Sequence, residues 1–398
     1  MANIIGYVDN SNGQSAHYNF FNVLREFALG YGTVSNLTYT GTGNGTLDNP
    51  KALPGAVTET WTITCTAATT DGGTFSVTGS VSGAQADATV GVLYDNGFVS
   101  FTISDGTTDF IVGDKFTFDT TQSDVSANGE NWEELIYDTS GSNWKTMLRG
   151  KGLTGSENIY IGFTTYHDVA NDYYNISVCM FTGYLPSETF ANQPGYKYSG
   201  IPLYKDRVDY WITLNAQRIA FCCKVDVSYY TSGYVGKFFP YATPSQYPYP
   251  VALFGMLQGN TANDYTAGNF GYFGYNANDD YYDDTTTLMN YWFVTPFNTL
   301  HMPSVAPFSN RHNYLYGGTN TLIDTNGEYP LVPAEIFVDP MNDTDVEGLF
   351  GQLDGIFWIS GWNNTAESTL TIGTDDYIIF KNKGNSADNQ FYAMRLDK

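Results

Sequence analysis

The stretch DYWITLNAQRIAFCCKVDVSYY (residues 209–230) decides the fold because it holds two strand-like runs joined by a short polar turn. β-branched and aromatic residues, which are favoured in strands, recur in both runs. Residues 214–217, LNAQ, form the predicted hairpin turn, and residues 218–230 form one long returning strand. The stretch therefore predicts an antiparallel β-sheet in this part of the chain.

Further strand-like runs of residues lie on both sides of this hairpin in the sequence. Before it stand NIYIGFTTY and DYYNISVCMFTGY, and after it, near the C-terminus, stand GIFWISGWN, DDYIIFKN and QFYAMRLDK. Between the hairpin and the C-terminal runs, the segment from about residue 254 to 330 is rich in Asn, Asp, Gly and Tyr and is predicted to form ordered loops and short strands. We expect a mainly β, multi-module, β-sandwich-like body over residues 122–398.

One segment has the period of a helix. In SAHYNFFNVLREFALGYG (residues 15–32), apolar residues recur near i, i+3, i+4 and i+7. Ser15 is placed to cap the start of this amphipathic helix and Gly30 its end. A Gly, Asn and Thr-rich loop follows, so residues 1–55 are predicted to be an N-terminal helix and loop that belong to the main body.

The pattern of apolar and polar residues is different between residues 56 and 121. ETWTITCTA, GTFSVTGSV, GFVSFTIS and DKFTFDT alternate apolar and polar residues with period 2, and TDGG, YDNG and SDGTTD separate them. These runs predict a small inserted antiparallel β domain of four or five strands.

Composition limits the classes of function. The 398 residues carry a formal net charge of -24, which repels phosphate backbones and anionic membranes, so nucleic acid is excluded as a partner. The N-terminus lacks the pattern of a secretion signal and no apolar run is long enough for a spanning helix, so we expect no membrane insertion and folding in a cytoplasm. The four cysteines show no CxxC pair and are predicted to be reduced core thiols.

No motif for catalysis is present in the sequence. There is no G-x-S-x-G elbow, no HExxH and no Walker A loop, and the four histidines match no metal-ligand spacing: His17, His167, His301 and His312. His17, which has no second ligand in the sequence, is expected to be exposed or hydrogen-bonded. No catalytic residue and no required cofactor are predicted.

An acidic cluster is the candidate cation site of the sequence. It lies in NANDDYYDDTTT and contains four aspartates: Asp279, Asp280, Asp283 and Asp284. Their oxygens suit a hard cation such as calcium, although the D-x-D-x-D-G loop is absent. The alternative is a solvent-facing turn, and the sequence leaves both open.

A second candidate site is YVGKFFPYATPSQYPYPVALFG, from Tyr234 to Gly255. Its four prolines remove backbone donors, so the segment is predicted to be a rigid corner and no central strand. Stiff aromatic loops lose little entropy on docking. The corner is therefore expected to present five rings to another module or subunit: Phe238, Phe239, Tyr241, Tyr247 and Tyr249.

Three stretches resemble virion structural proteins of tailed bacteriophages. They are YWITLNAQRIAFCCKVDVSYYTSGYVGKFFPYATPSQYPYP, the C-terminal GQLDGIFWISGWNNTAESTLTIGTDDYIIFKN, and the inserted VTETWTITCTAATTDGGTFSVTGSVSGAQADATVGVLYDNGFVSFTISDGTTDFIVGDKFTF. The last is similar to a small β module that recurs in phage head and tail proteins. Together they cover a little over a third of the chain, and none of them carries a catalytic residue.

This resemblance implies a non-enzymatic subunit of a virion, made in the cytoplasm of the host bacterium. The expected position is the tail end, namely baseplate, tail tip, collar or fibre attachment, and the expected partners are other virion proteins and further copies of the chain, as a homo-oligomer. Three alternatives are an adhesin that binds a host surface glycan, a head decoration protein and a polysaccharide depolymerase.

Overall fold

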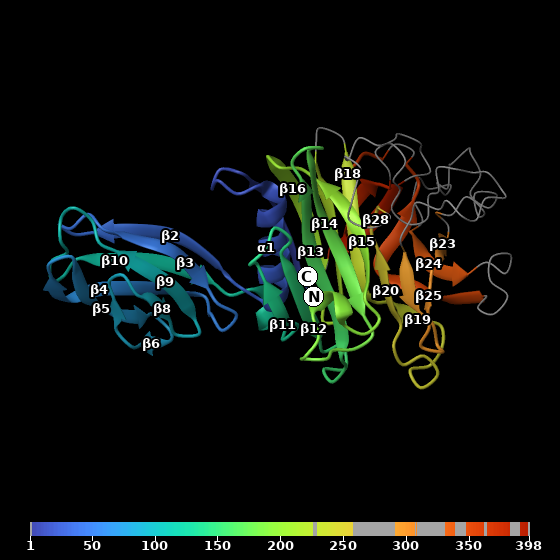
Figure 1. Ribbon diagram of the computed structural model, residues 1–398, viewed down its shortest axis with the longest axis horizontal. Coiled ribbons are helices and arrows are strands. Elements are labelled where there is room, and N and C mark those ends of the chain that lie inside the picture. The colour runs from blue at the N-terminus through green and yellow to red at the C-terminus, as the bar shows by residue number, and fades with distance from the viewer. Residues whose placement is uncertain are drawn as a thin grey trace. The chain divides into compact units, whose positions relative to one another are not determined.

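The computed structural model describes residues 2–225, 229–257, 291–306, 308, 331–338, 348–361, 364–382 and 391–396. The chain divides into two compact units. The larger unit comprises Met1–Arg25 and Trp132–Lys398, and the smaller one comprises Glu26–Asn131. Strands joined in antiparallel sheets make up most of the described chain, so the predicted mainly β fold is confirmed (Figure 1).

The described residues of the larger unit form three sheets. The central sheet has the order β1 (Ala2–Asp9), β16 (Arg207–Leu214), β17 (Arg218–Lys224), β18 (Tyr230–Lys237), β20 (Val251–Phe254), β21 (Trp292–Val294), β22 (Leu300–His301). A second sheet has the order β11 (Glu133–Asp138), β12 (Lys145–Gly150), β13 (Ile159–Asp168), β14 (Tyr173–Phe181), β15 (Lys197–Leu203). A short 3-10 helix, Phe190–Asn192, lies between β14 and β15 in the chain.

The third sheet of the larger unit is built mostly from the C-terminal part of the chain. Its order is β23 (Ser304–Ala306), β24 (Val332–Val338), β25 (Gly348–Ile359), β28 (Phe391–Leu396), β27 (Asp375–Lys381), β26 (Thr369–Ile372), and the two-residue β19 (Phe239–Pro240) also pairs with β25. Figure 1 shows the green strands of the second sheet, the yellow strands β18 and β20, and the orange and red third sheet in succession.

The central sheet is covered on both faces. On one face, Trp211, Cys222 and Tyr234 join the core that the third sheet closes, with the Trp211 ring 5.1 Å from that of Phe380. On the other face, strands β13, β14 and β15 contact β18. Two covered faces explain why β17 is buried from its first residue through Cys223, with no alternation of polar and apolar residues.

The predicted hairpin is confirmed, and one part of the prediction is wrong. Strands β16 and β17 pair antiparallel from Leu214↔Ile219 to Asp209↔Lys224 around the turn at residues 215–217. The long returning strand predicted for residues 218–230 ends at Lys224, and the chain reverses into β18, which pairs antiparallel with β17. Residues 218–223 are buried without alternation, so the sequence there shows no period from which the end of the strand could be predicted.

The turn between β16 and β17 is a centre of polar contacts. The Asn215 carbonyl accepts a hydrogen bond from the Trp132 indole at 3.0 Å, and the Asn215 amide donates to Asp354 Oδ2 at 2.7 Å. Asp354 is buried with Arg218, whose Nε lies 3.5 Å from Asp354 Oδ2, and Arg395 Nη2 donates to Asp354 Oδ1 at 2.9 Å. These contacts tie the central sheet to β25 and β28.

The predicted helix is confirmed as α1, Ala16–Leu29. Phe20 is fully buried and its ring lies 5.4 Å from that of Phe221 in the central sheet. Gly30 ends the helix with a φ of 83°, a conformation that glycine adopts without strain.

The smaller unit is a sandwich of two sheets around one core. One sheet has the order β2 (Thr33–Thr40), β10 (Lys115–Thr121), β4 (Glu59–Thr69), β5 (Gly72–Gly79), β6 (Gly83–Ala84), with β7 (Ala88–Thr89) also on β5. The other has the order β3 (Thr46–Ala52), β9 (Val99–Ser104), β8 (Leu93–Asp95), and a short helix α2 (Asp124–Ala127) follows β10 in the chain. Alternate residues such as Trp61, Ile63, Phe101 and Ile103 form its core.

This unit is larger than the predicted domain of residues 56–121, since it spans Glu26–Asn131. Residues 33–40 and 46–52, predicted as loop, are strands β2 and β3, which pair with β10 and β9. Both strands carry register shifts and an asparagine with positive φ, Asn36 and Asn49. Such bulges interrupt the period of 2 by which strands are found in a sequence.

Within the described residues, no helix has both the length and the apolar character needed to span a membrane.

Candidate functional site

The aromatic corner, residues 234–255, connects β18 to β20 by way of the short edge strand β19. Phe238 and Tyr247 are buried, with ring centroids 5.6 Å apart in an edge-to-face contact. The Tyr247 hydroxyl donates a hydrogen bond to the carbonyl of Val294. The prediction is wrong for these two rings, because they pack in the core of the larger unit and are not available to another subunit.

Tyr249 is held inside the larger unit by its hydroxyl group. This oxygen donates to the Phe181 carbonyl at 2.9 Å and accepts from the Tyr160 backbone N–H at 3.1 Å. Burial raises the pKa of Tyr249, so the phenol stays protonated and keeps its role as donor. The ring joins the corner to β13 and β14.

Phe239 and Tyr241 are the exposed rings of the corner, with 37% and 52% of their surface accessible. We call this pair the exposed aromatic pair. Phe239 lies opposite Gln352 in the pairing of β19 with β25, and the Tyr241 hydroxyl donates to a carboxylate oxygen of Glu335. Burial, together with that bond to Glu335, raises the pKa of Tyr241 to about 12. The Tyr241 side chain is therefore held by Glu335, and the backbone of Phe239 is held by β25.

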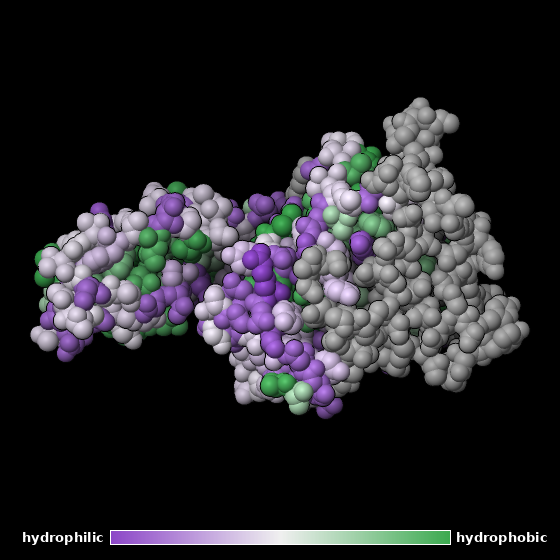
Figure 2. Space-filling view, turned by 90° about the horizontal axis from the view of Figure 1, so that it is seen from above, coloured by the Kyte–Doolittle hydropathy of each residue, from purple (hydrophilic) through white to green (hydrophobic). Residues whose placement is uncertain are grey.

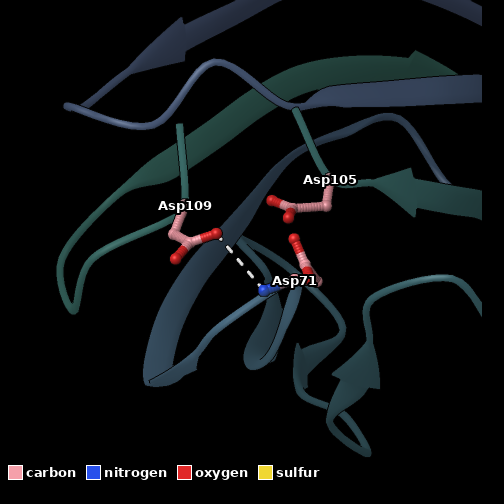
Figure 3. A group of neighbouring side chains, drawn as sticks. All are labelled: Asp71, Asp105 and Asp109. Atoms are coloured by element: carbon pink, nitrogen blue, oxygen red, sulfur yellow. Dashed lines mark hydrogen bonds between the residues drawn. The ribbon is translucent and has the colours of Figure 1, made fainter. Parts of the chain in front are cut away.

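A group of three carboxylates lies in the smaller unit (Figure 3). Asp71 stands in the turn between β4 and β5 with a φ of 53°, and Asp105 and Asp109 follow the end of β9. One carboxylate oxygen from each side chain lies within 4.8 Å of those of the other two, and Figure 3 shows the three groups pointing toward one another. All donor atoms are oxygens, the ligand type that hard divalent cations prefer.

Asn44 fixes the loop that carries two of these aspartates. Its Oδ1 accepts from the Thr108 N–H at 2.8 Å, its backbone N–H donates to the Thr108 carbonyl at 3.2 Å, and its amide donates to Thr107 Oγ1 at 2.9 Å. The Asp71 N–H in turn donates to Asp109 Oδ1 at 3.2 Å, which joins the two loops (Figure 3).

Asp105 differs from the nearby structural carboxylate Asp114. Asp114 accepts bonds from the backbone N–H groups of Thr42, Gly43 and Ile111, and from the Tyr39 hydroxyl. Burial acts to raise the pKa of Asp114, but these donors outweigh it and the pKa is lowered. In contrast, both carboxylate oxygens of Asp105 are buried and neither meets a hydrogen-bond donor from a described residue.

Exposed apolar side chains occur on the same unit. Ile111 and Val112, just after Asp109 in the chain, expose 49% and 65% of their surface. Figure 2 shows hydrophobic (green) patches among hydrophilic (purple) ones on this unit.

The sequence reasoning missed this acidic group. The segments TDGG and SDGTTD were predicted only as turns, and nothing in the sequence placed Asp71 beside Asp105. The predicted cation cluster, Asp279, Asp280, Asp283 and Asp284, lies outside the described residues, as does His312.

Two histidines lie close together in the larger unit. His17 is completely buried and its ring lies 5.9 Å from that of His167. Burial, with a smaller contribution from His167, lowers the pKa of His17 to about 3. Neither ring nitrogen of His17 has a hydrogen-bond partner among the residues that are described, so the expectation of an exposed or hydrogen-bonded side chain is wrong. Its edge-to-face contact with the Tyr174 ring, at 5.3 Å, places it in an aromatic cluster.

The four cysteines are buried and free, as predicted. Burial raises the pKa of the Cys222 thiol to about 12. A thiol with such a pKa is almost fully protonated at neutral pH and is a poor nucleophile.

Comparisons with protein families and with curated proteins give no relative. No family model matches the chain, and no curated protein matches it. Functional reasoning therefore depends on the sequence stretches and on the geometry described above.

Proposed function

We propose that the chain is a non-enzymatic structural subunit of a tailed bacteriophage virion, located at the tail end in a baseplate, tail tip, collar or fibre attachment. It assembles there with further copies of itself and with other virion proteins. The observation that carries this proposal is the exposed aromatic pair: Phe239 lies in the short strand β19, which pairs with β25, and Tyr241 follows this strand directly. Exposed Tyr and Phe side chains are typical anchors of protein interfaces.

The reactive groups of the larger unit support a structural role. Asp354 is occupied by Arg218 and Arg395, and the Cys222 thiol is protonated. His17, with a pKa near 3, is neutral at physiological pH and lies away from solvent. These groups are buried or ion-paired, and their environments do not favour general acid, general base or nucleophilic chemistry.

Assembly by the purified full chain tests the role of the exposed aromatic pair. The double variant Phe239→Ser and Tyr241→Ser is compared with Phe297→Ser, which changes an aromatic residue that is 77% exposed on another loop. We expect light scattering after size-exclusion chromatography to show oligomers for wild type and for Phe297→Ser, and their loss in the double variant. Equal assembly by all three proteins would contradict the assignment of this surface.

Position in the particle tests the proposal as a whole. Antibodies raised against the purified chain and applied to particles of the phage that encodes it should label the tail end in electron micrographs. Label on the head would favour a decoration protein. Binding of the isolated chain to susceptible cells would favour the adhesin, and saturable turnover of a host polysaccharide would contradict a non-enzymatic role.

A further inference from the structure

We propose that Asp71, Asp105 and Asp109 bind a divalent cation of the calcium class in the smaller unit. This site goes beyond the structural role proposed above. Its first support is geometric, since three carboxylate oxygens from two loops lie within 4.8 Å of one another. Calcium holds its oxygen ligands at about 2.3–2.6 Å, so ligands on opposite sides of one ion are about 5 Å apart.

The second support is the state of the Asp105 carboxylate. Its two oxygens are buried and have no donor among the described residues, whereas Asp114 nearby accepts four hydrogen bonds. An ionised carboxylate that is withdrawn from water without a partner is unfavourable. A cation between the three side chains would give the Asp105 carboxylate a partner.

The carboxylates of Asp71 and Asp109 also have oxygens that are available to bind a cation. Only Asp109 Oδ1 accepts a hydrogen bond, from the Asp71 N–H, and in the part of the chain that the structure describes no ion pair involves any of the three. Three carboxylates at this separation repel one another, and a bound cation reverses the sign of that interaction.

The chemistry of the site favours calcium over other metals. No nitrogen or sulfur ligand is present in the group, which disfavours zinc and copper. Asp71 is exposed, so water is able to complete the six to eight ligands that calcium takes. The smaller unit contains 12 acidic and two basic residues, a net charge of -10, which concentrates cations around it.

Calorimetric titration of the chelator-treated full chain with calcium chloride tests the site. The variants are Asp105→Asn, which keeps the shape of the side chain, and Asp87→Asn, a matched control at an exposed position of the same unit. We expect wild type and Asp87→Asn to bind with a Kd of roughly 10⁻⁴–10⁻³ M, as weaker protein calcium sites do. Asp105→Asn should lose that binding step or weaken it at least about tenfold.

Thermal unfolding separates a binding role from a purely structural one. Calcium should raise the Tm of wild type and of Asp87→Asn by a few degrees, on the order expected for a ligand that binds only the folded state, and leave Asp105→Asn unchanged. In chelator, Asp105→Asn should be at least as stable as wild type, because one repelling charge is gone. If Asp105→Asn does not fold, Asp71→Asn at the exposed member of the group replaces it, with the same expectations.

Three results would overturn the proposal. The first is the absence of calcium binding by wild type at millimolar concentration. The second is an Asp105→Asn isotherm equal to that of wild type, which would place any binding elsewhere in this acidic chain. The third is an equal rise in Tm with magnesium, whose ligands lie at about 2.0–2.1 Å and demand a tighter site.

Discussion

Replacement of Asp354 by asparagine removes a negative charge from a buried group that contains Arg218 and Arg395. The two Asp354 oxygens accept from Asn215 Nδ2 at 2.7 Å, Gln217 Nε2 at 3.1 Å and Arg395 Nη2 at 2.9 Å, and Arg218 Nε lies 3.5 Å away. An asparagine offers one oxygen and turns an NH₂ group toward donors. Arg218, which is fully buried, loses its ion pair with Asp354.

The expected cost follows from these contacts. A donor that loses its acceptor in the core costs about 1–3 kcal/mol, and removal of one partner from a buried ion pair costs about 3–5 kcal/mol in total. We therefore expect the free energy of unfolding of the larger unit to fall by about 3–5 kcal/mol. The exposed Asp375→Asn on β27 is the control and should change it by no more than about 0.5 kcal/mol.

Urea unfolding of the full chain, followed by tryptophan fluorescence, measures this difference. Six of the seven tryptophans belong to the larger unit, since Trp61 alone lies within residues 26–131, so the signal reports mainly on that unit. A loss below about 1 kcal/mol for Asp354→Asn, with an unchanged slope against urea, would refute the reasoning, because it would show that the charge is dispensable for the buried group.

Three further outcomes are expected. Burial acts to raise the pKa of Asp354, but Arg218 and the hydrogen bonds outweigh it and lower that pKa below 3.8. The difference in the free energy of unfolding between wild type and Asp354→Asn should therefore stay constant from pH 7 to about pH 5 and shrink as the pH falls below about 4. Urea titrations at each pH measure this difference. Tyr249→Phe removes a hydroxyl that serves two strands and should lower the free energy of unfolding by about 1–2 kcal/mol in the same assay, and no change would show that these bonds are not needed. The Cys222 thiol, with its pKa near 12, should not react with a thiol reagent at pH 8 until urea unfolds the chain, and rapid labelling of the folded protein at this residue would contradict its burial.

Local patterns in the sequence revealed those helices and strands that bury only one face. Helix α1 has one buried stripe, and strands β4 and β9 have one buried face each, so their periods of 3.6 and 2 are visible. Strand β17 is buried on both faces and shows no period, which is why its end at Lys224 was missed. Strands β2 and β3 were missed because bulges interrupt both of them, and because most side chains of β2 are exposed.

The sites depend on contacts between distant residues, which a single sequence does not contain. Phe238 and Phe239 are adjacent and chemically identical, yet Phe238, between β18 and β19, packs in the core against Tyr247, whereas Phe239 in β19 is exposed. Asp71 and Asp105 meet only through the pairing of sheets in the sandwich. Turn composition predicted the loops that carry them, but their separation in space is a property of the folded chain.

The pairing of β1 with β16 also has a consequence for synthesis on the ribosome. Asp9 pairs with Arg207, so β1 emerges about 200 residues before its partner strand, which at 5–20 residues per second is roughly 10–40 s. The whole of the smaller unit is made within this interval, and all of its strands pair with one another. The smaller unit is therefore expected to fold while synthesis of the larger unit is still incomplete. Until residue 214 has emerged from the ribosome, β1 has no strand to pair with, and such unpaired strands are segments that chaperones protect from aggregation.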